Sequence, residues 1–455
     1  MTRRPFWIAL AALATIGVAS SHGQTPAQSA QGRTLAVTVI RAGRLLDVRA
    51  GHLLTDQGIL VEGDRIKEVG PYAQVQAKAP QTARAIDLSR ATVLPGLIDC
   101  HTHLLMADDT RDLAQMSTAE RVLLGAATAR DALEAGVTTV RDLGNSGAGG
   151  DVALRNGILA GWVGGPRIIA STRALSPVGG QFDSMRSAVA TTLVAEEYVG
   201  VSGPAEARRA VDEAVFAGAD IIKVIVDTGI RENYTSVLDE DTLRAIVEEA
   251  HRSRVKVAAH AIMNTAVRAA ARAGVDSIEH AYFASDENLR LMHDKGIYLV
   301  PTDSEQPTAF YVDRLKRAMK LGVKMAFGSD ARGLPPNHPV NQKTFKERSV
   351  GTLVAYQKAG IAPIDIIRMA TIDASALIGW EDPPGSLEPT EQKWIVDEAR
   401  DWRNRLGSIE AGRFADIIAV GGDPLQDLGE LLKVEFVMKG GSVMERSSSA
   451  GTPRR

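Results

Sequence analysis

The sequence of 455 residues predicts an α/β fold, a closed (β/α)8 TIM barrel with a small β-sandwich domain built from both termini. One pattern recurs along the middle of the chain. An amphipathic helical segment is followed by a glycine that suits the left-handed position after a helix, then by a short apolar run and a polar residue. The strands of this pattern are expected in residues 91–103, 134–142, 166–172, 216–227, 254–261, 272–281, 294–302 and 320–331. Eight strand–helix units favour a closed barrel over an open doubly wound sheet.

Short strands without long helices flank the predicted barrel, residues 94–380. Examples are "VTVIRAGRLLD" near the N-terminus and "VEFVMKGGSVMER" near the C-terminus. We therefore expect residues 35–93 and 406–447 to form one β-sandwich. The charged segment 381–405, which contains Pro-Pro and two tryptophans, is expected to be an inserted surface segment.

The N-terminus has the composition of an export signal. Two arginines precede the apolar run "FWIALAALATIGVA" and then small and polar residues, so residues 1–23 are predicted to be a cleaved signal peptide. An uncut membrane anchor is the alternative, but the run is shorter than the roughly 20 apolar residues that span a bilayer. Residues 24–34 would be a flexible leader and residues 448–455 a disordered tail. We expect the mature protein in the periplasm or outside the cell, where the single cysteine, Cys100, excludes an intramolecular disulfide.

Charge restricts the classes of partner. The chain has 52 Lys and Arg against 55 Asp and Glu, a net charge of -3, and no long block of like charges. This balance gives no electrostatic footprint for nucleic acid or for an anionic membrane surface. We expect a small-molecule or short-peptide substrate, and a homo-oligomer stays open.

The segment "LPGLIDCHTHLL" places two histidines two residues apart at the end of a buried strand. Residues i and i+2 of a strand point to the same side, so His101 and His103 face one cavity. Taken alone, the pair fits either a metal ion or two satisfied core histidines. The C-terminal ends of barrel strands converge on one site. The other strand ends carry His260, His280 and Asp330, and the whole set favours a site for Zn²⁺ or a similar divalent ion.

Lys223 is unusual because "DIIKVIV" otherwise predicts a buried strand. Burial disfavours the ammonium form and lowers the pKa of a lysine. Two interpretations remain open at this point. The amine could pair with a carboxylate, or a neutral amine could react with carbon dioxide to give a carbamate that bridges two cations.

These residues resemble the amidohydrolase superfamily. The match comprises the HTH motif, the strand-four lysine, the histidines of "AAHA" and "SIEHA" and the aspartate of "GSDA". The motifs "TTVRDLG", "AFGSDA" and "GSIEAGRFADIIAV" are most similar to the metal-dependent Xaa-Pro dipeptidase and carboxypeptidase-like subgroup, which is related to imidazolonepropionases. That subgroup includes secreted enzymes that hydrolyse ochratoxin A. The resemblance covers nearly the whole mature chain.

The resemblance implies two divalent metal ions, with Zn²⁺ favoured. An N6-carboxylated Lys223 and a hydroxide would bridge them, and Asp330 would move a proton from the hydroxide to the leaving amine. Imidazolonepropionases resemble a single-metal arrangement without this lysine, so Lys223 argues against that assignment. The ligands would be His101, His103 and Asp330 for the more buried ion and His260 and His280 for the second.

Candidate substrate-binding residues follow the strands. A substrate with a free carboxylate needs a cation or a phenol at the mouth. Arg231 and Tyr234 after strand four are candidates, against the alternative of a solvated loop, and the resemblance favours Tyr234. Arg332 and His338 after strand eight are further candidates. Asp142 is expected to accept a hydrogen bond from a ligand histidine.

Three departures from the family pattern predict a more apolar and more open mouth. Gln181 stands where relatives tend to have a histidine, and "HAIMN", which contains Met263, replaces His-Ala-His-Gly. The loop 301–316 is short for the subgroup. We expect Gln181 and Met263 to contact a bulky, partly aromatic acyl or aminoacyl group.

These observations predict an exported, binuclear metal-dependent amidohydrolase. It would cleave the amide bond of N-acyl or aminoacyl amino acids, like a carboxypeptidase or dipeptidase, with ochratoxin A as one candidate substrate. A cyclic-amide hydrolase or deaminase on the same barrel is the first alternative, although "AHAIMN" lacks the extra acid that a deaminase usually needs. The second alternative is an exported metal- or solute-binding protein, which would not need Asp330 as a proton shuttle.

Overall fold

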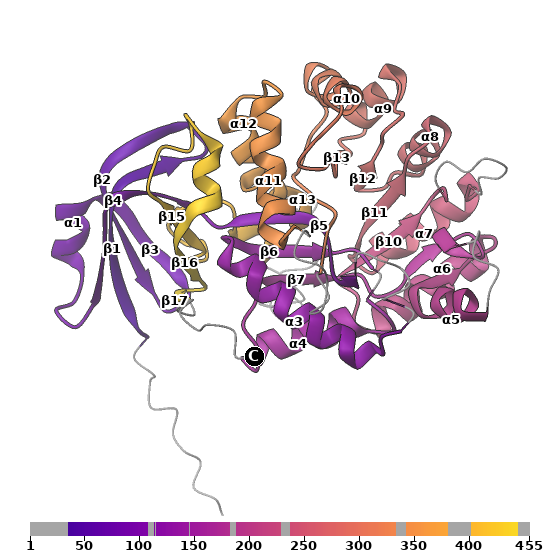
Figure 1. Ribbon diagram of the computed structural model, residues 1–455, viewed down its shortest axis with the longest axis horizontal. Coiled ribbons are helices and arrows are strands. Elements are labelled where there is room, and N and C mark those ends of the chain that lie inside the picture. Colours follow the sequence, from indigo (N-terminus) through magenta and orange to yellow (C-terminus); the bar gives the residue numbers. More distant parts are fainter. Residues whose placement is uncertain are drawn as a thin grey trace, which may run out of the picture. The chain divides into compact units, whose positions relative to one another are not determined.

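A ring of parallel strands forms the centre of the protein in the computed structural model (Figure 1). Residues from Ala36 on belong to one compact unit. The residues that the structure describes are 35–107, 113, 115–144, 146–182, 188–228, 237–333, 343–380 and 402–444. The predictions that fall outside these ranges concern segments 1–23, 24–34 and 448–455, residues 381–401 of the predicted insertion, Arg231, Tyr234 and His338.

Eight segments build the ring in chain order. They are β5 (Leu97–Ala107), β6 (Val137–Asp142), β7 (Arg167–Ala170), β10 (Ile221–Ile225), β11 (Lys256–Ala261), β12 (Ser277–His280), β13 (Tyr298–Val300) and an extended segment, 323–330, that leads into β14 (Ala331–Gly333). Adjacent strands pair in parallel. Two further short strands, β8 (Ala174–Ser176) and β9 (Tyr198–Gly200), follow β7 and pair beside β10.

Backbone hydrogen bonds close the ring where regular strand pairing is interrupted. The Asp220 amide donates to the Ala170 carbonyl at 2.7 Å, which joins the third and fourth segments. The Cys100 amide donates to the Phe327 carbonyl at 2.8 Å, which joins the first and eighth. The predicted (β/α)8 barrel is therefore confirmed.

Helices cover the outside of the ring (Figure 1). They pack through apolar faces, as in α7, where Leu243, Ile246 and Ala250 are buried against the barrel. The helices are α3 (Thr118–Glu134), α4 (Gly150–Leu159), α5 (Ala188–Glu197), α6 (Pro204–Phe216), α7 (Glu240–Arg252), α8 (Asn264–Ala273), α9 (Asp286–Asp294), α10 (Ala309–Lys320), α11 (Phe345–Lys358), α12 (Pro363–Met369) and α13 (Ile372–Ile378). None of the helices in the described ranges is long and apolar enough to span a bilayer.

Both termini contribute to a second β-domain, as predicted. Its seven strands form one mixed sheet, in which the indigo N-terminal and yellow C-terminal strands lie together (Figure 1). The order is β17 (Ser442–Val443), β16 (Val434–Lys439), β15 (Ile417–Val420), β4 (Arg84–Pro95), β1 (Val37–Asp47), β2 (His52–Glu62) and β3 (Arg65–Pro71), with α1 (Tyr72–Lys78) beside it. The sheet encloses its own core of Ile40, Ile59, Val93 and Ile417. Strand β4 ends at Pro95, two residues before β5 begins, so it leads directly into the barrel.

Candidate active site

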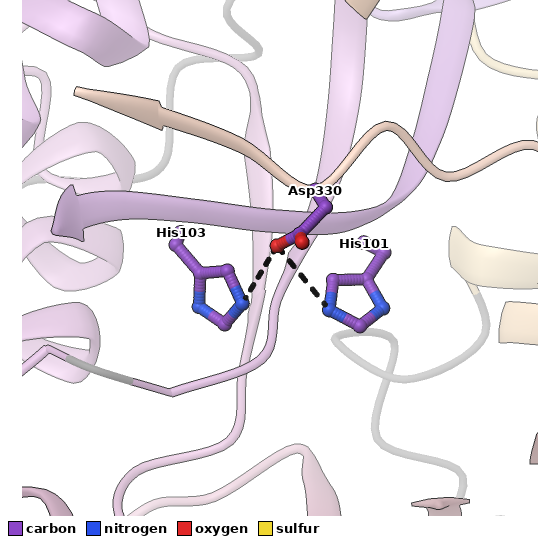
Figure 2. A group of neighbouring side chains, drawn as sticks. All are labelled: His101, His103 and Asp330. Carbon is purple, nitrogen blue, oxygen red and sulfur yellow. Dashed lines mark ion pairs between the residues drawn. The ribbon is translucent and has the colours of Figure 1, made fainter. Parts of the chain in front are cut away.

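His101, His103 and Asp330 come together at the seam between the first and last barrel segments (Figure 2). Asp330 Oδ1 lies 3.2 Å from His103 Nε2 and 3.9 Å from His101 Nε2. One candidate ligand atom from each residue lies within 4.8 Å of the other two. The spacing of the HTH motif on β5 accounts for the two imidazoles facing the same carboxylate.

The remaining predicted ligands surround this group. Lys223 Nζ from β10 lies 3.5 Å from His101 Nε2. The His280 ring lies 5.1 Å from that of His101, and the His260 ring lies 4.5 Å from that of His280, centroid to centroid. All of these side chains line one cavity of about 370 Å³, so the convergence expected from the strand ends is present.

Burial and neighbouring charges set these groups in states that can bind a cation. Burial, reinforced by Lys223, holds the pKa of His101 well below its usual range, and burial with nearby cationic groups does the same for His260 and His280. Burial also lowers the pKa of Lys223 to about 8. For Asp330, burial raises the pKa, but its charged neighbours outweigh this effect and hold it well below the usual value. Neutral imidazoles and an ionised carboxylate are the forms that coordinate a divalent ion.

Hydrogen bonds fix the orientation of three of the imidazoles through Nδ1. His101 Nδ1 lies 2.7 Å from Glu279 Oε2, and His280 Nδ1 lies 2.6 Å from Thr302 Oγ1. His103 Nδ1 lies 2.8 Å from the Gly144 carbonyl oxygen. Partners of this kind hold a metal-binding histidine in one tautomer and leave its Nε2 to face the ion.

Glu279 belongs to a buried charge network inside the barrel. Its side chain is 0% exposed. Arg141 Nη2 donates to Glu279 Oε1 at 2.7 Å, and Ser277 Oγ donates to the same oxygen at 2.5 Å. Because Oε2 contacts His101, one carboxylate connects a metal-ligand candidate on β5 to an arginine on β6.

The backbone is left-handed at three residues around the site. The φ angles are +70° for His280, +55° for Thr302 and +56° for Asp330. Such conformations cost about 1–3 kcal/mol each in non-glycine residues and occur preferentially at functional sites. Gly328 has a separate constraint, since a Cβ there would lie 2.4 Å from Val300 Cγ1 and 2.7 Å from His101 Cβ.

The predicted substrate-binding residues are placed differently from one another. Gln181 and Arg332 line the cavity. Met263 is not among the described lining residues. The adjacent Ile262 lines the cavity, while Met263 packs against the barrel core and donates its amide to Asp227 at 2.8 Å.

Asp142 has other partners than the expected histidine. Its Oδ1 accepts the Leu104 amide at 3.2 Å, and Ser146 Oγ lies 3.5 Å from Oδ2. The acceptor for His103 is the Gly144 carbonyl. Asp142 therefore stabilises the β5 backbone beside the site, and a main-chain group takes the role that we expected of it.

Sequence reasoning missed four residues that support the site: Arg141, Glu279, Thr302 and Tyr282. A usable signal existed for Arg141 and Glu279, because each is a charged residue inside a segment predicted to be a buried barrel strand, and the two charges are opposite. Buried charges of this kind are expected to pair. Thr302 and Tyr282 follow strands in loops, where the sequence offered no comparable signal.

An aromatic chain extends from the cavity wall to the surface. Tyr282, which lines the cavity, lies 4.6 Å from Tyr311 between ring centroids, and Tyr311 lies 5.7 Å from Phe310. Phe310 lies 5.3 Å from Phe283, and these two phenylalanines are 46% and 41% exposed. The chain of rings therefore connects the cavity wall to an exposed apolar surface.

Comparison with known proteins assigns the family. Residues 92–396 match the amidohydrolase family, and residues 58–81 match the imidazolonepropionase-like composite domain of bacteria. This match covers more than half of the chain, which therefore belongs to the amidohydrolase family. Together with the barrel and the candidate metal site, it defines the protein as an amidohydrolase-family hydrolase.

Individual relatives point to one part of that family. The chain is 28% identical over 462 residues to the ochratoxinase of Aspergillus niger, covering 90% of this chain and 87% of the relative. It is similar to the structure of a Xaa-Pro dipeptidase with bound methionine, with TM-score 0.74, 28% identity and coverage of 90% and 100%. It is also similar to a prolidase complexed with N-methylphosphonate-L-proline, with TM-score 0.75, 27% identity and the same coverage.

Proposed function

We propose that this protein is an exported, binuclear metal-dependent hydrolase that cleaves the amide bond of N-acyl or aminoacyl amino acids. The position of Lys223 carries the proposal. Its buried amine lies 3.5 Å from His101 Nε2, on the wall of the cavity that the other predicted ligands line, and burial lowers its pKa to about 8, which increases the fraction of neutral, reactive amine over that of an ordinary lysine. The names and bound ligands of the similar dipeptidase and prolidase structures support an amino-acid or dipeptide-like substrate.

The donor set fits two divalent ions, with Zn²⁺ favoured by the imidazoles. Lys223, as a carbamate formed with carbon dioxide, would supply a further oxygen ligand. Bound ions would polarise the substrate carbonyl and lower the pKa of water. The proposed ligands are His101, His103 and Asp330 for one ion and His260 and His280 for the other.

The side chains of the protein would supply positioning and proton transfer. Asp330 is ionised, so it can accept a proton from the attacking water and return it to the leaving nitrogen. The carbon–nitrogen bond breaks as a carbon–oxygen bond forms, which gives a carboxylic acid and an amine. Glu279 and Thr302 hold the His101 and His280 rings during these steps.

Two parts of the proposal rest on sequence alone. Export rests on the signal-like residues 1–23. Tyr234 and Arg231 stay predicted carboxylate-binding residues on the basis of sequence. Gln181 supports a cavity mouth that differs from the family pattern. Its Nε2 lies 3.3 Å from His260 Nε2, and its Oε1 accepts a hydrogen bond from Tyr198.

Amino-acid release tests the function. Zn²⁺-loaded protein would be incubated with N-acyl amino acids, Xaa-Pro and Xaa-Phe dipeptides and ochratoxin A, beside a chelator-treated sample and Asp330→Asn. We expect release that chelation abolishes and that Asp330→Asn reduces by at least about a hundredfold. Absence of release from every substrate, with metal confirmed bound, would reject the proposal and favour a cyclic-amide substrate, in line with the imidazolonepropionase-like segment.

A further inference from the structure

Arg332 lies beside the proton-transfer residue on the cavity wall. It belongs to β14 and pairs in register with His103 of β5. Arg332 and Asp330 both line the cavity, and the Arg332 side chain is 33% exposed. Its Nη2 lies 3.6 Å from Asp330 Oδ2.

The guanidinium of Arg332 has no hydrogen-bond acceptor among the described residues. Its separation from Asp330 exceeds hydrogen-bond distance, and its Nε is buried without a partner. An enclosed donor left unpaired is unfavourable, and a bound anion near the guanidinium would offset part of that cost. Lys223, the other cationic side chain in the described lining, is only 2% exposed and lies against His101. Among the described residues that line the cavity, Arg332 is therefore the cationic side chain that an incoming anion can reach.

We propose that Arg332 binds the α-carboxylate of the amino acid that leaves the site. This inference rests on the proposed amide hydrolysis and assigns the residue that selects substrates with a free α-carboxylate. Asp330 would return the proton to the leaving nitrogen, and in an α-amino acid the carboxylate lies two bonds from that nitrogen. A guanidinium next to Asp330 is placed to bind that group, and it offers the planar donors that match a carboxylate. Free α-amino acid conjugates are then preferred over their amides and over β-amino acid conjugates.

A supporting role for Arg332 is the competing explanation. The guanidinium contributes to holding the pKa of Asp330 low, and this effect alone would require no contact with substrate. The two roles differ in a measurable way. Loss of a merely supporting residue weakens the binding of charged and neutral substrates equally. Loss of a residue that pairs with the carboxylate weakens the binding of the charged substrates only.

The test compares two ligands that differ only in this charge. N-methylphosphonate-L-proline and its L-prolinamide counterpart would be titrated calorimetrically into metal-saturated protein, so binding is measured without turnover. The variants are Arg332→Gln and Arg332→Lys, and metal content is measured for each. The control is Arg209→Gln on α6, which removes an arginine with a 73% exposed side chain outside the site.

We expect Arg332→Gln to weaken the binding of the acid about ten- to a hundredfold and the binding of the amide less than about threefold. Arg332→Lys should give an intermediate affinity for the acid. In the wild type, N-benzoylglycine should be hydrolysed faster than N-benzoyl-β-alanine, and Arg332→Gln should reduce this ratio. Equal weakening of acid and amide, or no weakening, would overturn the proposal. If no N-benzoyl conjugate is hydrolysed, the wider set of dipeptides, N-acyl amino acids and ochratoxin A decides the proposed function, and the calorimetric comparison still decides the role of Arg332.

Discussion

Replacing Glu279 by glutamine tests whether a buried charge holds the metal site together. Glutamine preserves the shape of the side chain but removes its negative charge. Arg141 Nη2 lies 2.7 Å from Glu279 Oε1, and two unit charges at that distance attract by about 6 kcal/mol at an effective dielectric constant of about 20. Desolvation offsets part of this attraction. Removing one partner of a buried pair therefore costs about 3–5 kcal/mol, because the other charge stays buried without compensation.

The same substitution should reach the metal through His101. The glutamine amide cannot both accept from His101 Nδ1 and satisfy Arg141 as a carboxylate does. Loss of such a partner typically reduces metal affinity about 10- to 100-fold. Competition with a chromogenic chelator measures that affinity. Thermal melting of metal-free protein separately measures the loss of stability caused by the unpaired buried charge.

Two further variants make the result interpretable. Glu213→Gln is the control, because it removes one member of an exposed ion pair with Arg209. It should lower the free energy of unfolding by at most about 0.5 kcal/mol. The double variant Arg141→Gln with Glu279→Gln should recover part of the lost stability, since no uncompensated charge stays buried. If Glu279→Gln keeps both wild-type Zn²⁺ affinity and the wild-type melting temperature, the reasoning is refuted.

Three other predictions follow from the same geometry. Gly328→Ala should cost about 1–3 kcal/mol in unfolding free energy and weaken metal binding, because its Cβ would overlap Val300 and His101. Gly274→Ala is the control: its Cβ would have no atom within 4 Å, and although its φ is +83°, metal affinity should stay unchanged. Because burial lowers the pKa of Lys223 from 10.5 to about 8, the unfolded chain holds more protons between these values, so metal-free, carbonate-free protein should gain stability as the pH rises from about 8 to about 10.5. Burial also lowers the pKa of Lys439 to about 8, so thermal melts across that range should show a shallower slope for Lys223→Met than for the wild type. Burial raises the pKa of the Cys100 thiol to about 12, so a disulfide reagent should modify no thiol in the native protein and one per chain in denaturant.

Strand periodicity and the residues at strand ends were sufficient to predict the barrel and its ligand candidates. Each of these features can be recognised within a short stretch of sequence. A side chain at the C-terminal end of a barrel strand faces the site wherever that strand lies in the ring. His101, Lys223, His260, His280 and Asp330 could be placed together by this rule alone.

The partners that orient the ligands could not be predicted in the same way. The acceptor for His103 is a backbone carbonyl, and every residue carries one, so composition cannot distinguish it. The partner of His101 is Glu279 on a non-adjacent strand, and this contact depends on ring register rather than on sequence spacing. The short strands β8 and β9 were missed for a related reason, since three-residue segments carry too little periodicity to be distinguished from loops.

The seam of the barrel has a consequence for how the protein matures. His101 stands on the first barrel strand, and Asp330 is the last residue of the extended segment 323–330. The Asp330 amide donates to the His101 carbonyl at 2.8 Å. A ribosome must therefore synthesise nearly the entire ring before these two ligands can meet. Contacts so distant in sequence form late and slowly. An ion bound between them would crosslink the two ends of the ring, so metal supply would govern how long a newly made chain stays open to proteases.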